Sequence, residues 1–116
     1  MEPLLRKKES SKSVYLRIHH RHNREVLALC DESLLGQVIF NEKAQMKVPT
    51  DFYRGQKITS EEALQLMRNY VNINALGSTI ELGIKNKVIK KDAVIWFKTS
   101  DGKKIPHLLI FSFPPI

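Results

Sequence analysis

The stretch EVLALC at residues 25–30 contains five consecutive apolar residues, Val26 to Cys30. A short run that is apolar at every position is typical of a strand buried on both faces. Upstream, Val14, Leu16 and Ile18 alternate with more polar residues, which indicates a half-buried strand. Because only a short polar segment separates the two runs, the sequence predicts that they form an antiparallel hairpin.

The segment between these strands, HHRHNR at residues 19–24, holds three of the four histidines of the chain. The hairpin prediction places it at the turn, where Asn23 can supply the turn conformation. Zinc sites usually show paired Cys or His ligands, and His19, His20 and His22 have no second cluster to join. The lone Cys30 lies in an apolar run, which favours a buried thiol. We therefore expect no metal site.

Two helices are predicted by capping signals. Thr59-Ser-Glu-Glu62 forms a capping box, followed by apolar residues at helical spacing to about residue 72. Ser78-Thr-Ile-Glu81 forms a second capping box and predicts a shorter helix to about residue 86. Upstream of both, Asp31 is expected to cap one helical turn, Glu32 to Leu35.

The remaining segments predict strands at residues 37–41, 44–48, 93–98 and 104–113. Asp101-Gly102 favours a hairpin between the last two, and Pro106 predicts that the last strand lies at a sheet edge or bends. The expected fold is α+β, with a mostly antiparallel sheet of hairpins and two helices packed on one face. We expect a flexible basic extension over residues 1–12, a single domain over 13–113 and a tail over 114–116.

The composition fits one soluble globular domain of 116 residues, 42% hydrophobic and 27% charged. No apolar run approaches the ~20 residues that a membrane-spanning helix needs. The basic N-terminal residues are not followed by the apolar core of a signal peptide. A single cysteine is typical of a reducing compartment. These features predict a cytoplasmic protein.

The net charge of +7 is unevenly distributed along the chain. Residues 31–84 are mildly acidic, whereas residues 85–104 hold seven lysines and two aspartates. Such segregation favours a polyanionic partner, and lysines bind phosphates through counterion release. Trp96 and Phe97 lie in an apolar strand, which favours packing over base stacking. The predicted RNA-binding residues are Arg6, Lys7, Lys8, Arg17, Arg21, Lys85, Lys87, Lys90, Lys91, Lys98, Lys103 and Lys104.

Catalytic and cofactor motifs are not found in the sequence. It contains no G-x-S-x-G nucleophile motif, no dinucleotide-binding glycine pattern and no Walker motif. We therefore expect a protein that is not an enzyme and that needs no cofactor.

Five patterns occur in a fixed order: VLALCDESLLG (26–36), FYRG (52–55), SEEALQLM (60–67), NINALGSTIELGI (72–84) and IPH (105–107). In this order the chain resembles an archaeal family known as domain of unknown function 424. The resemblance covers roughly residues 14–107 and implies an archaeal, cytosolic, single-domain α+β protein, without implying an activity. Among the positions that carry it, Asp31, Tyr53, Asn74 and His107 are polar and form a candidate shared site.

The leading hypothesis is a small basic RNA-binding protein associated with the ribosome or the translation apparatus. Its partner would be structured RNA or a ribosomal subunit, contacted mainly by residues 85–104, with the basic extension ordering on binding. One alternative is a protein-interaction module that uses the acidic residues 31–84 or the apolar residues 111–116. Another is an enzyme with a site around His107.

Overall fold

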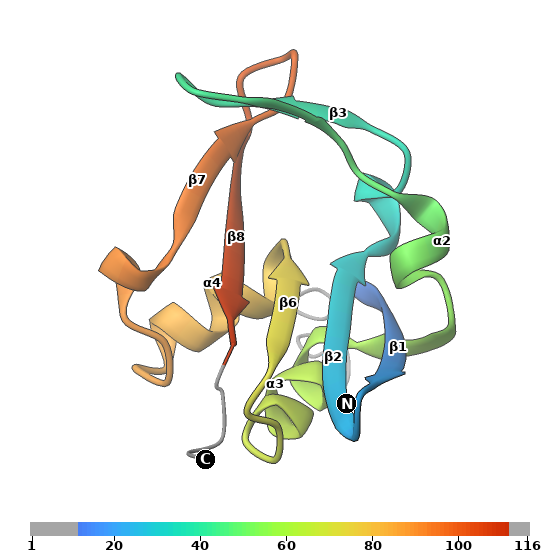
Figure 1. Ribbon diagram of the computed structural model, residues 1–116. Coiled ribbons are helices and arrows are strands. Elements are labelled where there is room, and N and C mark those ends of the chain that lie inside the picture. Colours follow the sequence, from blue (N-terminus) through green and yellow to red (C-terminus); the bar gives the residue numbers. More distant parts are fainter. Residues whose placement is uncertain (1–11, 112–116) are drawn as a thin grey trace, which may run out of the picture.

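The computed structural model describes residues 12–111. The predicted basic extension, apart from Lys12, and the predicted tail lie outside the described residues. The described part is a single domain built on one eight-stranded sheet (Figure 1). Its strands are β1 (Ser13–Arg21), β2 (Arg24–Asp31), β3 (Val38–Phe40), β4 (Gln45–Lys47), β5 (Gln56–Thr59), β6 (Ile73–Leu76), β7 (Ile95–Lys98) and β8 (Lys104–Ile110). Its helices are α2 (Thr50–Tyr53), α3 (Ser60–Met67) and α4 (Ser78–Lys85), with 3₁₀ turns η1 (Glu32–Leu34) and η2 (Lys91–Ala93).

The sheet has the strand order β4-β3-β7-β8-β6-β2-β1-β5 and is mixed. Six of its seven strand pairings are antiparallel, and β2 pairs with β6 in parallel. The predicted α+β class is confirmed, but the sheet is mixed, because the β2–β6 pair is parallel and cannot be part of a hairpin. The parallel pair was not predicted, because β6 is only four residues long and directly follows the segment that was predicted to be helical to about residue 72.

The β1–β2 hairpin forms as predicted, with Arg21 opposite Arg24 and a two-residue turn. His22 and Asn23 both have positive φ values, 52° and 63°, which match the twist of a tight hairpin. Strand β2 is buried on both faces, since every residue from Leu27 to Cys30 has 0% exposure. The doubly buried strand predicted from EVLALC is therefore confirmed.

Two apolar clusters occupy the two faces of β2. Leu27 and Leu29 belong to the cluster that α3 and α4 cover, while Ala28 and Cys30 belong to the other. The second cluster also contains Ile39 of β3, although β7, β8 and β6 lie between β3 and β2 in the sheet. The sheet must curl for this contact to form, and Figure 1 shows β3 arching over the ends of the other strands.

The capping predictions had different outcomes. The capping box of Thr59 and Glu62 is present at the start of α3. The helix ends at Met67 rather than near residue 72, because the chain enters the sheet, where Leu27 donates its N–H to the carbonyl of Asn72. The predicted second capping box is wrong, since the N-cap of α4 is Gly77.

Asp31 reaches across to α4 instead of capping the turn that follows it. Its carboxylate accepts the Ser78 N–H at 2.9 Å and the Ser78 hydroxyl at 2.6 Å, and it makes no capping bond to η1. Asp31 is only 7% exposed, and burial raises its pKa although the Ser78 hydrogen bonds lower it. Gly77 fits beside this carboxylate because it has no side chain and a φ of 103°.

Strand β8 lies between β7 and β6, so of the two alternatives predicted for Pro106, an edge strand or a bend, the edge position is wrong. Pro106 lacks an N–H, and its carbonyl accepts the N–H of Gly77 at 3.0 Å. The carbonyl of Gly77 accepts hydrogen bonds from the N–H groups of Ile80 and Glu81 in the first turn of α4. Proline is tolerated inside the sheet here because the hydrogen-bond ladder between β8 and β6 ends at this residue, so no β6 carbonyl needs an N–H from Pro106. Within residues 12–111, no helix is long and apolar enough to cross a membrane.

Gly77→Ala tests how tightly Asp31 and α4 are joined. A Cβ at Gly77 would lie 2.5 Å from Asp31 Oδ2, whereas one at Gly102, which has φ 87°, would meet nothing within 4 Å. We expect Gly102→Ala to cost about 1 kcal/mol from backbone strain alone. Gly77→Ala should cost about 3 kcal/mol, because the Asp31–Ser78 hydrogen bonds are also disrupted. Urea unfolding measures both, and equal losses would contradict this account.

Candidate nucleic-acid interface

The seven lysines of residues 85–104 lie on consecutive elements along one flank of the molecule. This lysine flank runs from the end of α4 through η2 and β7 to Lys104 at the start of β8, and all seven residues are exposed. Figure 1 shows η2 and β7 on the side away from β1. Of these lysines, Lys91, Lys98 and Lys104 line one common groove.

Carboxylates of the described residues form no ion pairs with this flank. Within residues 12–111, none of the seven lysines lies within ion-pair distance of a carboxylate. By contrast, Lys57 on the β5 edge pairs with Glu32 at 3.1 Å. The lysine flank consequently presents ammonium groups that are available to an external anion.

A groove of about 680 Å³ opens on this flank and combines aromatic rings with lysines. Its lining residues are Phe40, Asn41, Glu42, Lys91, Trp96, Phe97, Lys98 and Lys104. Phe97 is buried at 7% exposure, as expected for a core aromatic residue, but Trp96 is only half-buried and Phe40 is 37% exposed. The groove therefore offers partly exposed aromatic surface, which the packing interpretation of this strand did not include.

Phe40 was missed at the level of sequence because it joins the groove through a long-range strand pairing. It lies opposite Lys98 where β3 meets β7, and Lys98 lies opposite Lys104 where β7 meets β8. No local pattern connects Phe40 to a segment more than fifty residues downstream. The pairing of β3 with β7 brings the aromatic residue to the lysines.

The other predicted RNA-binding residues do not join this surface. Arg17 and Arg21 lie on β1, which is separated from β7 by β8, β6 and β2. The Arg17 guanidinium donates to the Asp51 carbonyl at 2.6 Å, so it has a structural partner. Arg6, Lys7 and Lys8 lie outside the described residues.

Three of the four residues of the candidate shared site meet on the face of the sheet opposite α3 and α4. The Tyr53 hydroxyl donates to Asn74 Oδ1 at 2.7 Å, and His107 Nε2 lies 3.0 Å from the same oxygen. Since Oδ1 is an acceptor, the network requires His107 to carry its proton on Nε2. Burial raises the pKa of Tyr53 and lowers the pKa of His107, so both are held neutral.

Asp31 does not belong to this network. It alternates with Cys30 along β2, and its side chain contacts Ser78 on the face covered by α4. Cys30 lies on the opposite face and donates its S–H to the Asp31 carbonyl at 3.4 Å. Burial raises the Cys30 pKa, which keeps the thiol protonated and unreactive.

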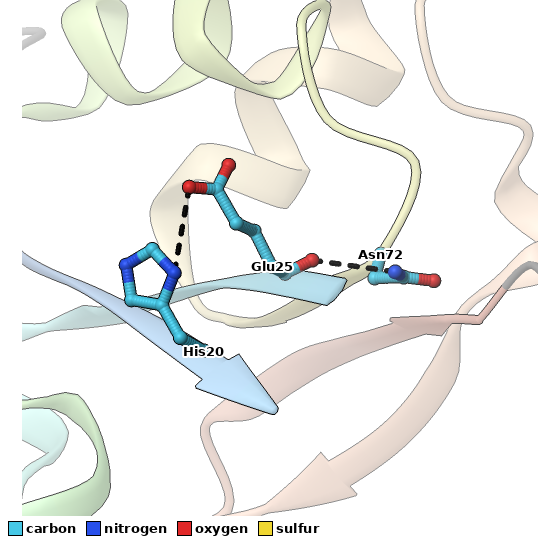
Figure 2. A network of polar contacts seen from close by, with 3 residues as sticks. All are labelled: His20, Glu25 and Asn72. Carbon is cyan, nitrogen blue, oxygen red and sulfur yellow. Dashed lines mark hydrogen bonds and ion pairs between the residues drawn. The ribbon is translucent and has the colours of Figure 1, made fainter. Parts of the chain in front are cut away.

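The histidines of HHRHNR make separate contacts at the end of the hairpin. His19 stacks on Phe52 with ring centroids 4.3 Å apart, and its Nε2 lies 2.7 Å from the Phe52 carbonyl oxygen. His20 faces Glu25 at 3.6 Å, and Asn72 donates to the Glu25 carbonyl at 3.3 Å (Figure 2). Among the described residues, no three His, Cys, Asp or Glu side chains are grouped to hold a metal.

Comparison with known proteins places this architecture in a family. The family described as "Protein of unknown function (DUF424)" matches residues 18–108. The chain belongs to this family. The predicted resemblance is thereby confirmed, and the matched range includes Phe40, the lysine flank and the Tyr53–Asn74–His107 network.

A solved structure shares the fold of this DUF424 member. It is described as the crystal structure of an uncharacterized conserved protein from Methanopyrus kandleri, with 25% identity and a TM-score of 0.63. The similarity covers 90% of this chain and 97% of that one. The comparison with curated proteins found no match.

The His107 environment predicts a pH dependence of stability. In the folded protein the pKa of His107 lies below the ordinary 6.5. The neutral His107 therefore contributes fully to the free energy of unfolding above pH 6.5, and this contribution is lost as the pH falls from 6.5 toward the folded pKa. His107→Gln keeps an N–H donor for Asn74 but cannot be protonated. Between pH 8 and pH 5, wild type should lose more unfolding free energy than this variant. The exposed His20→Gln serves as control, and parallel pH profiles for wild type and His107→Gln would contradict the assignment.

Proposed function

We propose that this DUF424 protein binds RNA through its lysine flank and acts with the ribosome or another part of the translation apparatus. The observation that carries the proposal is the groove in which Lys91, Lys98 and Lys104 surround exposed aromatic surface. Lysines without carboxylate partners, adjacent to aromatic rings, suit a ligand that carries both phosphates and planar bases.

The physical basis of binding is release of the counterions that surround RNA phosphates. Seven lysines and two aspartates in residues 85–104 give this segment a net charge of +5, while residues 31–84 carry −2. This asymmetry orients the protein toward a polyanion and also distinguishes the flank from a surface that is charged only for solubility.

Lys87 supports a role for the flank beyond solubility. It occupies the residue after the cap of α4 with a φ of 61°, where glycine is the usual choice. Its N–H bonds to the Ile84 carbonyl, and the N–H of Val88 bonds to the Gly83 carbonyl, which completes a Schellman motif. A lysine here keeps a cation on the flank at a cost of about 1 kcal/mol in backbone strain.

Removing Lys87 should therefore separate stability from binding. Lys87→Gly relieves the strained backbone and should raise the unfolding free energy by about 0.5–1 kcal/mol. Lys85→Gly, at the last residue of α4, should lower it by a comparable amount. Both variants lose one positive charge, so both should weaken RNA binding to a similar extent. Chemical unfolding and fluorescence anisotropy provide the two readouts. If Lys87→Gly kept the wild-type RNA affinity and only Lys85→Gly lost it, affinity would depend on stability instead of charge, which would contradict the role of the flank.

The binding proposal is tested most simply by the salt dependence of RNA affinity. Substituting Lys91, Lys98 and Lys104 with Gln should reduce the slope of log affinity against log salt by about 2. A control with Arg21, Arg54 and Lys57 changed to Gln alters the net charge equally but lies near β1 and β5, which are separated from β7 by β8, β6 and β2, and it should keep the wild-type slope. Absence of salt-sensitive RNA binding by wild type, or equal slopes for both variants, would overturn the proposal.

A protein partner is the second candidate, favoured by exposed apolar side chains at the start of β7 and the end of β8. Ile95, Leu109, Ile110 and Phe111 are between 41% and 51% exposed. Affinity purification from native cells, with and without ribonuclease, separates the two functions. Partners that are lost after ribonuclease treatment support RNA binding, and a protein partner retained after treatment supports the alternative.

An enzyme centred on His107 is not proposed. The Tyr53 hydroxyl proton and the His107 Nε2 proton are both directed at one oxygen of Asn74. Tyr53 is 2% exposed, so its hydroxyl is buried away from any substrate. Such a network is typical of a satisfied buried polar group.

A further inference from the structure

We infer that the groove on the lysine flank receives an unpaired nucleobase of single-stranded RNA, stacked on Phe40, while Lys91, Lys98 and Lys104 contact the neighbouring phosphates. The inference rests on the proposed function and adds its substrate class, single-stranded rather than double-helical RNA. The aromatic and cationic residues that carry it come from β3, β7, β8 and η2.

Strand register aligns the groove residues across three strands. Phe40 lies opposite Lys98, and Lys98 lies opposite Lys104. The three side chains therefore project from the same face of the sheet, with about 5 Å between the Cβ atoms of each pair. Trp96 lies two residues before Lys98 on the same face of β7. Lys91 in η2 also lines the groove. The groove therefore combines the partly exposed ring of Phe40 with three ammonium groups.

The dimensions and exposure of the groove suit a base. Its volume of about 680 Å³ lies within the range of small-ligand sites. Phe40 is an aromatic side chain that is 37% exposed, and base stacking on such a ring contributes about 1–3 kcal/mol. A double helix keeps its bases stacked internally, whereas single-stranded RNA can place an unstacked base on an aromatic side chain.

The charges around the groove favour phosphate at its borders. Three lysines line it together with one acidic residue, Glu42. Glu42 lies in the turn after β3, where its carboxylate repels phosphate but can accept hydrogen bonds from the amino groups of a base. The arrangement therefore fits a ligand that has a planar group with amino donors between two anionic groups, as a nucleotide within a strand does.

The test compares one short RNA oligonucleotide as a single strand and annealed to its complement, by fluorescence anisotropy. Wild type should bind the single strand at least tenfold more tightly. Phe40→Leu keeps the apolar character but removes the ring, and should weaken single-strand binding about tenfold without changing duplex binding. Phe40→Tyr should restore wild-type affinity. Val38→Ala is the matched control, because Val38 is also 37% exposed on β3 but does not line the groove.

Trp96 provides a direct signal because it is the single tryptophan of the chain and lines the groove. Single-stranded RNA should quench its fluorescence, and duplex RNA should not. If wild type binds RNA with a strong salt dependence but Phe40→Leu binds the single strand equally well, or if Trp96 is not quenched, the base-stacking inference is overturned while the proposed function stands. If wild type binds neither RNA, the proposed function fails as well.

Discussion

The parallel pairing of β2 with β6 is the constraint on which the rest of the structure depends. Strand β2 is buried on both faces, so each side needs its own cover, and the two apolar clusters supply it. Strand β6 then leads into α4 through Gly77, where the Asp31 carboxylate at the end of β2 accepts two hydrogen bonds from Ser78. One junction therefore fixes the sheet, the start of α4 and, through the Gly77–Pro106 hydrogen bond, the position of β8.

This junction also determines where the lysines lie. Helix α4 starts at the junction and ends in the Schellman motif at Lys87, after which the chain turns through η2 into β7. Because β7 is held between β8 and β3, the direct pairing of β3 with β7 places Phe40 beside Lys98. The groove is therefore a product of long-range topology, although most of its charges come from one continuous segment.

Local patterns predicted the elements that they encode locally. The run at residues 26–30, which is apolar at every position, identified the strand that is buried on both faces. The Thr59–Glu62 capping box identified the start of α3. The polar segment between two apolar runs identified the first hairpin. Features set by distant partners were missed or assigned incorrectly. Asp31 resembled a local cap but binds Ser78, 47 residues away, and β6 is recognisable only beside β2. The lysines of the flank could be selected from charge alone, whereas Phe40 could not be selected without the β3–β7 pairing.

Binding of RNA at the flank formed by residues 85–104, together with Phe40, can be followed residue by residue in an NMR titration. The isotope-labelled full-length protein is titrated with a short single-stranded RNA, and backbone amides and the Trp96 indole N–H are observed. Shift changes should concentrate at Trp96, Lys98, Phe40 and the neighbouring lysines, with little change along β1. Changes confined to the β1–β2 hairpin, or none at saturating RNA, would show that RNA does not bind at this surface.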